Sequence, residues 1–169
     1  MKIHGNAAWV FPDNFDIDYI IGIQNIGLQS VADITNCLMR DFDSNFSQHI
    51  SPGDILIGGK SFGYGHAHPQ PMIGMRAVGI HCVIAESYTF PFYRSELASG
   101  MKLLICPDIT KYVKRGDPIW ADTQSGEVTL GNGDTLPLLK VDDYPNQLME
   151  LGGVVPLIKA WREQKGKRS

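Results

Sequence analysis

Two histidines stand two residues apart in a glycine-rich stretch, residues 58–71, of this 169-residue sequence. Imidazole titrates near neutral pH, so it can give or take a proton or bind a metal ion. In an extended segment, side chains two residues apart point the same way. His66 and His68 are therefore predicted to contact a substrate or transfer a proton, with a purely structural role in the loop as the alternative. Two histidines alone are a weak basis for a metal site, because a catalytic zinc normally has three protein ligands.

The glycines of this stretch also suit a binding loop. Gly63 and Gly65 permit backbone conformations that other residues avoid, and they let a ligand approach the main chain. A helix expected after Pro71 directs free N–H groups toward the loop, which favours a carboxylate or phosphate. A tight strand-to-helix turn without a ligand is the alternative. The stretch is not a phosphate loop, because Asp54 stands where that motif has its first glycine, and His68 breaks the dinucleotide fingerprint.

Charged side chains outside the loop offer two further groups. Asp13, Asp16 and Asp18 form an acidic cluster. A divalent cation is one candidate ligand, but the spacing lacks the glycine turn and distal glutamate of an EF-hand, and turn formation is the alternative for Asp13 and Asp16. Arg94 falls in the first turn of a predicted helix, which is an unfavourable place for a cation. We expect it to face a carboxylate, either of a ligand or of a structural ion pair.

The elements that must position these groups alternate between strands and helices. The pattern predicts strands over residues 54–57, 82–85 and 102–106 and helices over residues 72–78 and 92–99. Such a βαβαβ unit makes a parallel sheet, and its ligands bind beyond the carboxyl ends of the strands. The loops at residues 58–71 and 86–91 are therefore expected to form the site.

The flanking segments are less regular. The first fifty residues are expected to be irregular, apart from a helix over residues 31–39 capped by Ser30 and a loop over residues 41–51. The last third is expected to contain strands at 119–121, 127–130 and 135–138, helices at 146–151 and 154–164, and a solvated tail at 165–169.

The composition narrows the function classes. Fifteen Lys and Arg against eighteen Asp and Glu give a net charge of −3, so no basic field exists to hold nucleic acid or an anionic membrane. No apolar run is long enough to span a bilayer, and the first residues lack an apolar signal core. Cys37, Cys82 and Cys106 are widely spaced, which is typical of reduced thiols in a cytoplasmic protein and argues against an iron–sulfur cluster held by this chain alone.

Several blocks of the sequence, in order and at matching spacing, resemble the small subunit of 3-isopropylmalate dehydratase. Residues 13–21, DNFDIDYII, resemble its DNIDTDxII opening, and residues 52–63, PGDILIGGKSFG, resemble PGDIIVAGKNFG. Residues 79–88, GIHCVIAESY, resemble GIKAVIAKSF, and residues 92–95, FYRS, resemble FYRN. With LGG at residues 151–153, the similarity covers nearly the whole chain.

The family is the swivelling domain of aconitase-like hydro-lyases. The resemblance implies an α/β fold with three layers, β/β/α, around a βαβαβ parallel core, as a single domain over residues 1–169. It implies a large partner subunit that carries a [4Fe–4S] cluster, over which this chain closes, so that no metal is bound by this chain itself. It also implies a cytoplasmic dehydratase or isomerase of a small hydroxy acid.

The active-site loop departs from the family pattern GCGSSREH. His66 takes the place of the serine that acts as base, Ala67 that of the second serine, and His68 that of an arginine that binds a substrate carboxylate. Gln24 takes the place of another anion-binding arginine, whereas Asp18 of the opening motif is kept. The loss of two guanidinium groups removes bidentate recognition of carboxylates.

By this resemblance, catalytic roles fall to His66, His68 and Asp18. The positions expected to bind substrate are Gly63, Tyr64, Gly65, Ala67, Gln24 and Arg94. We expect a substrate unlike isopropylmalate, with fewer carboxylates or a different group where arginine would bind. His66 would remove a proton from carbon, His68 would orient or protonate, and cluster iron would assist the leaving hydroxyl as a Lewis acid.

Other interpretations of the same residues stay open at this point. The chain could be the small subunit of 3-isopropylmalate dehydratase proper, in leucine synthesis. It could be a non-catalytic binding or assembly subunit, because the serine and both arginines are absent. A mononuclear metal enzyme that uses His66 and His68 without a partner is the remaining alternative.

Overall fold

The structure is a computed structural model that describes residues 1–66 and 68–166. Ala67, one of the predicted substrate contacts, and the last three residues of the predicted tail lie outside the described residues.

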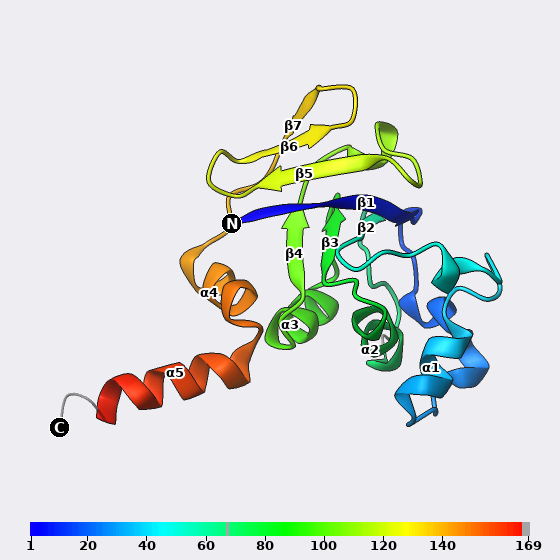
Figure 1. Ribbon diagram of the computed structural model, residues 1–169, viewed down its shortest axis with the longest axis horizontal. Coiled ribbons are helices and arrows are strands. Elements are labelled where there is room, and N and C mark those ends of the chain that lie inside the picture. Colours follow the sequence, from blue (N-terminus) through cyan, green and yellow to red (C-terminus); the bar gives the residue numbers. More distant parts are fainter. Residues whose placement is uncertain (67, 167–169) are drawn as a thin grey trace.

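The architecture is a mixed α/β fold built on one seven-stranded sheet with the order β4-β3-β2-β1-β5-β6-β7 (Figure 1). The strands are β1 (Lys2–Val10), β2 (Ile55–Gly58), β3 (Cys82–Ala85), β4 (Lys102–Ile105), β5 (Pro118–Asp122), β6 (Glu127–Leu130) and β7 (Thr135–Pro137). Strands β1 to β4 pair in parallel, whereas β1, β5, β6 and β7 pair antiparallel. In the view of Figure 1, β5–β7 lie beyond β1, on the side away from the helices that flank the parallel strands. The predicted fold class is confirmed, with the two β layers as two halves of one sheet.

Strand β1 joins these halves, and the expectation of an irregular N-terminal segment was wrong for it. Its first part, Lys2 to Asn6, pairs with β5, and its second part, from Ala7 on, pairs with β2. The segment contains glycine, asparagine and two alanines, which have low strand propensity, so its extended shape depends on partners far away in the chain. A Cβ at Gly5 would overlap the backbone oxygen of Gly53, which explains the glycine at this crossing point.

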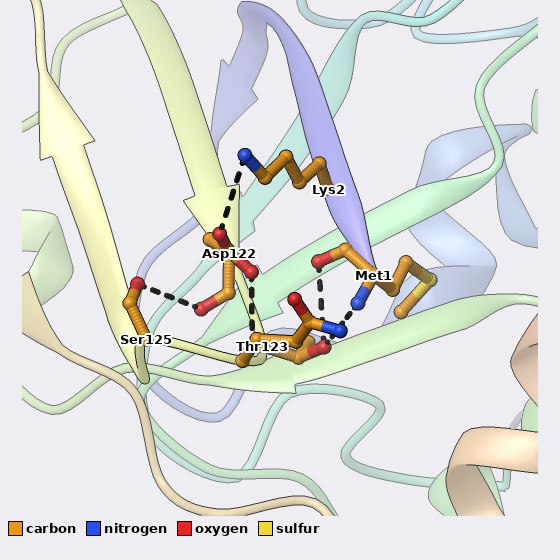
Figure 2. Close-up of polar contacts among 6 residues, drawn as sticks. Met1, Lys2, Asp122, Thr123 and Ser125 are labelled. Atoms are coloured by element: carbon orange, nitrogen blue, oxygen red, sulfur yellow. Dashed lines mark hydrogen bonds and ion pairs between the residues drawn. The ribbon is translucent and has the colours of Figure 1, made fainter.

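The start of β1 is tied to the end of β5 by polar contacts at the N-terminus (Figure 2). The Met1 ammonium donates to Thr123 Oγ1 at 2.8 Å, and the Thr123 N–H donates to the Met1 carbonyl at 3.0 Å. Lys2 and Asp122 form an exposed ion pair at 3.9 Å beside them. These contacts hold the register of the central strand at its free end.

The predicted βαβαβ unit is confirmed by β2, α2 (Gln70–Ala77), β3, α3 (Phe90–Ala98) and β4. Every residue of β2 and β3 is buried, as expected for parallel strands covered on both faces. Both helices begin two residues earlier than predicted. Arg94 therefore lies beyond the first turn of α3, and its predicted place in that turn was wrong.

The remaining helices flank this unit. Helix α1 (Val31–Cys37) packs against α2, and its N-cap Ser30 accepts a hydrogen bond from the Asp33 N–H, as predicted. Short 3₁₀ turns lie at η1 (Ile17–Ile20), η2 (Ile23–Asn25), η3 (Phe46–Gln48) and η4 (Ile109–Lys111).

The C-terminal part ends in two helices. Helix α4 (Asp143–Leu151) packs against α3, and α5 (Val154–Gly166) leads away from the body of the molecule (Figure 1). Among the helices in the described part of the chain, none has the length and apolar character needed to cross a membrane.

Candidate active site

The loop that carries the histidines, residues 63–69, follows β2 and is held from both sides. The Tyr64 N–H donates to the Phe15 carbonyl at 3.1 Å, on the side of the opening segment. On the other side, Thr89 Oγ1 donates to the Gly63 carbonyl at 2.7 Å, and the Phe62 N–H donates to the Ser87 carbonyl at 3.0 Å. The two loops predicted from the parallel topology, residues 58–71 and 86–91, therefore meet here.

The two glycines of this loop are required by its packing. Gly63 has φ +82 and Gly65 has φ +87, a region in which residues with a side chain are strained. A Cβ at Gly63 would overlap the ring of Phe92, and a Cβ at Gly65 would overlap the carboxylate of Asp16. Phe92 belongs to a buried aromatic cluster with Phe62, whose ring centroid lies 5.4 Å away. The loop thus rests directly on the core.

Asp18 and His68 form a hydrogen-bonded pair at the base of the loop. The His68 N–H donates to Asp18 Oδ1 at 3.0 Å, and the ring Nδ1–H donates to Asp18 Oδ2 at 2.7 Å. Asp18 is only 6% exposed. Its position is set by η1, because the N-cap Asp16 accepts a hydrogen bond from the Asp18 N–H at 3.0 Å. A carboxylate on Nδ1 fixes the ring orientation and leaves Nε2 of His68 to accept or donate a proton.

His66 lies next to this pair. Its ring centroid is 5.4 Å from that of His68, with the two planes at 72°. Both rings line one cleft of about 400 Å³, and its walls come from η1, the loop and α3. The prediction that the two side chains face the same space agrees with this arrangement. In size, the cleft suits a small organic acid.

Arg94 brings a cation to the same cleft from α3. Its guanidinium carbon lies 5.6 Å from the centre of the exposed Phe90 ring. Within the described residues, no carboxylate lies within ion-pair distance of Arg94. The structural ion pair considered for this residue is therefore not seen there, and its guanidinium is available to an anion.

A carboxylate in the wall of the cleft was not anticipated. Glu96 of α3 lines the cleft and is 4% exposed. Its Oε2 accepts a hydrogen bond from Nη1 of Arg76 on α2 at 2.5 Å. Burial raises the pKa of Glu96, and the Arg76 guanidinium acts in the opposite direction. The two residues sit in separate predicted helices, and nothing in the sequence pairs them.

The N-terminus of α2 is a poorer anion site than the sequence implied. The Ile73 N–H already donates to the Pro69 carbonyl at 3.0 Å, and Pro71 has no N–H. Two of the four N–H positions in the first turn are therefore not available to an anion.

Two predicted substrate-binding residues do not line the histidine cleft. Gln24 lies in η2, is exposed, and folds its amide back over Gly22. Tyr64 is 54% exposed and lines a separate hollow of about 510 Å³ with Tyr19 and Phe42. These side chains lie at the surface around the loop.

Two of the three cysteines are poor ligands for a metal cluster. Burial raises the pKa of Cys82 and Cys106 to about 12, which opposes the thiolate form that ligates iron. Within residues 1–66 and 68–166, no three His, Cys, Asp or Glu side chains converge in a way that would hold a metal ion.

Comparisons with known proteins agree with the motifs. The chain is 32% identical over 153 residues to "Isopropylmalate/citramalate isomerase small subunit" of Methanocaldococcus jannaschii, covering 90% of this chain and 91% of that protein. It is 30% identical over 161 residues to "2,3-dimethylmalate dehydratase small subunit" of Eubacterium barkeri, covering 95% and 98%. No family model matches the chain.

A solved structure gives the same result at the level of the fold. The 3-isopropylmalate dehydratase (leuD) structure from Methanocaldococcus jannaschii matches with a TM-score of 0.88 and 27% identity, covering all of both chains. The resemblance seen in the motifs is confirmed. The chain belongs to the family of small subunits of 3-isopropylmalate dehydratase and related aconitase-type hydro-lyases.

Proposed function

We propose that this chain, together with a large subunit, dehydrates a small hydroxy acid in the histidine cleft. The observation that carries the proposal is the pair formed by His68 and the buried Asp18, beside His66, in a cleft that also holds the guanidinium of Arg94. These groups supply what a dehydration needs from this chain: an anchor for a carboxylate and two imidazoles for proton transfer.

The roles follow from the geometry. His66 has an exposed ring in the cleft and takes the proton from the carbon next to the leaving hydroxyl. His68, oriented by Asp18, donates the proton of its Nε2–H to the leaving hydroxyl, which departs as water. Arg94 binds one carboxylate by a charge-assisted hydrogen bond. The relatives named above act, by their names, on malate derivatives, which are hydroxy acids of this size.

The substrate is proposed to differ from isopropylmalate. The family's serines and its two anion-binding arginines are replaced here by His66, Ala67, His68 and Gln24. Of the described residues that line the cleft, only Arg94 carries a guanidinium. A substrate with one strongly bound carboxylate fits this cleft better than a dicarboxylate.

The large subunit is proposed to dock over the mouth of the cleft and to carry the [4Fe–4S] cluster. Relatives named as small subunits support the existence of this partner. The surface around the cleft exposes large apolar side chains that a partner would cover: Phe90, at 72%, Tyr64, Tyr19 and Phe42. A cytoplasmic location also stays a prediction, supported by the three free thiols.

The proposal is tested by purifying the chain with its large subunit under anaerobic conditions and screening hydroxy acids for dehydration. His66→Ala and His68→Ala are expected to lower turnover by about 10²–10⁴-fold, while both variants still bind the large subunit. His4→Ala, an exposed histidine on β1, is the matched control and should keep full turnover. Full turnover in His66→Ala would remove the assigned base, and a chain that purifies without any large partner would contradict the function.

A further inference from the structure

The wall of the cleft contains a carboxylate that the proposed reaction does not use. Glu96 lines the same space as His66, His68 and Arg94, yet it is almost fully buried as a residue. A buried carboxylate is costly unless a partner compensates it. Its presence in the wall of a binding cleft therefore calls for a reason.

Arg76 provides that compensation and holds the carboxylate in place. Its guanidinium reaches from α2 to Oε2 of Glu96, and the two side chains are 22% and 5% exposed. No described group donates a hydrogen bond to the other oxygen, Oε1. Glu96 is thus anchored through one oxygen, with the second available as an acceptor.

The ion pair between Arg76 and Glu96 also bears on which cationic side chains are available to bind a ligand. Arg76 is engaged by Glu96, and it is not among the described residues that line the cleft. Arg94 is left as the guanidinium in the cleft that has no described carboxylate partner. Within about 400 Å³, a second ligand carboxylate would lie close to Glu96, and like charges repel strongly in a partly desolvated site.

We propose that Glu96 is a specificity-determining residue, which rejects a second carboxylate and selects a substrate group that donates a hydrogen bond, such as a hydroxyl. This inference rests on the proposed function and names its substrate class: a hydroxy monocarboxylate, with its carboxylate at Arg94 and its donor at Oε1 of Glu96. A neutral glutamine in place of Glu96 would still accept a hydrogen bond, although a weaker one, and would no longer repel an anion.

Two matched probes test this charge selection in the full-length chain. Glycerate and tartronate share a three-carbon skeleton, and the CH₂OH group of glycerate is replaced by a second carboxylate in tartronate. Dissociation constants are measured by NMR titration, followed at the resonances of the loop and α3. The wild type is expected to bind glycerate about tenfold more tightly than tartronate.

Variants assign this preference to one side chain. In Glu96→Gln, the dissociation constant of tartronate is expected to fall about tenfold, and that of glycerate to change less than threefold. Glu163 is an exposed glutamate on α5, and Glu163→Gln should leave both dissociation constants unchanged. Arg94→Gln should lower the affinity for both probes, and this result would show that they bind in the cleft. If Glu96→Gln does not fold, the double variant Arg76→Gln/Glu96→Gln is used instead, because it replaces both charged groups by a pair of amides. It is expected to show the same change in the two dissociation constants.

Three results would overturn the inference. The first is that the wild type binds both probes with equal affinity. The second is that Glu96→Gln loses affinity for both probes to the same extent. The third is that neither probe shifts the resonances of the loop and α3. A complex that turns over but keeps its preference in Glu96→Gln would refute this inference alone. A chain that shows the expected binding pattern, in a complex that dehydrates no hydroxy acid, would refute the proposed function alone.

Discussion

Asp18 accepts two hydrogen bonds from His68, one from its backbone N–H at 3.0 Å and one from its ring Nδ1–H at 2.7 Å, although the residues are fifty positions apart. One carboxylate therefore fixes both the path of the loop and the orientation of the imidazole. Because Asp18 is buried and held by η1, the ring has little freedom. The His68 ring is in this way held in one orientation before any ligand binds.

Replacing Asp18 by asparagine tests this orientation. The amide cannot accept from both donors at once, so the His68 ring is expected to turn or to change its tautomer. Turnover of the complex should fall by about 10²-fold or more, chiefly in kcat, while the affinity for the large subunit is retained. Asp33→Asn, an exposed aspartate in α1, is the control and should have full activity. Unchanged kcat in Asp18→Asn would show that the pair only stabilises the loop.

The effect of a side chain at Gly63, at the start of the loop, can be compared with its effect at another glycine of similar φ. Gly63 and Gly133 have φ values of +82 and +89, but a Cβ would overlap Phe92 at Gly63 and meets nothing within 4 Å at Gly133. Gly133→Ala is expected to cost about 1 kcal/mol from backbone strain alone. Gly63→Ala should lower the free energy of unfolding by about 2–4 kcal/mol, because overpacking of the core adds to the backbone strain. Urea unfolding measures both, and equal losses would contradict the contact with Phe92.

The three cysteines should differ in reactivity. With the pKa of Cys82 and Cys106 raised to about 12, only about one thiol in ten thousand is ionised at pH 8. Cys37 is only half-buried. Iodoacetamide at pH 8 is therefore expected to label Cys37 alone in the native chain and all three cysteines in urea, as read from peptide masses. Labelling of Cys82 or Cys106 at the rate of Cys37 would show that the core opens far more readily than its packing implies.

Glu96 should give the stability of the chain a definite pH dependence. Burial raises its pKa in the folded state above the ordinary value of 4.5, so the folded state binds the proton more tightly than the unfolded chain. Its contribution to stability is greatest below the unfolded pKa and is lost as the pH rises through the folded pKa. The free energy of unfolding of the wild type minus that of Glu96→Gln should therefore fall as the pH rises from about 4. A constant or rising difference in urea unfolding would contradict this sign.

Local sequence patterns determined the elements around the site. The runs at 82–85 and 102–106 are short and apolar between turn residues, and each forms a strand close to its predicted bounds. Gly79 and Gly100 mark the ends of the two crossover helices, both with positive φ. The order of the motifs along the chain also sufficed to place it in its family. Such signals act within a few residues, so they can be recognised before the chain is folded.

Only the tertiary structure decided the contents of the cleft. β1 lacks strong strand propensity and becomes a strand because it pairs with β2 and β5, more than forty and one hundred residues away. The bond from Asp18 to His68 and the ion pair from Arg76 to Glu96 join separate elements, and their partners are chosen by how the elements pack. Hydrogen bonds and ion pairs of this kind depend on distances of about 3 Å, which spacing in a sequence does not encode. The sequence therefore determined which chemical groups are present, and packing determined which of them act together.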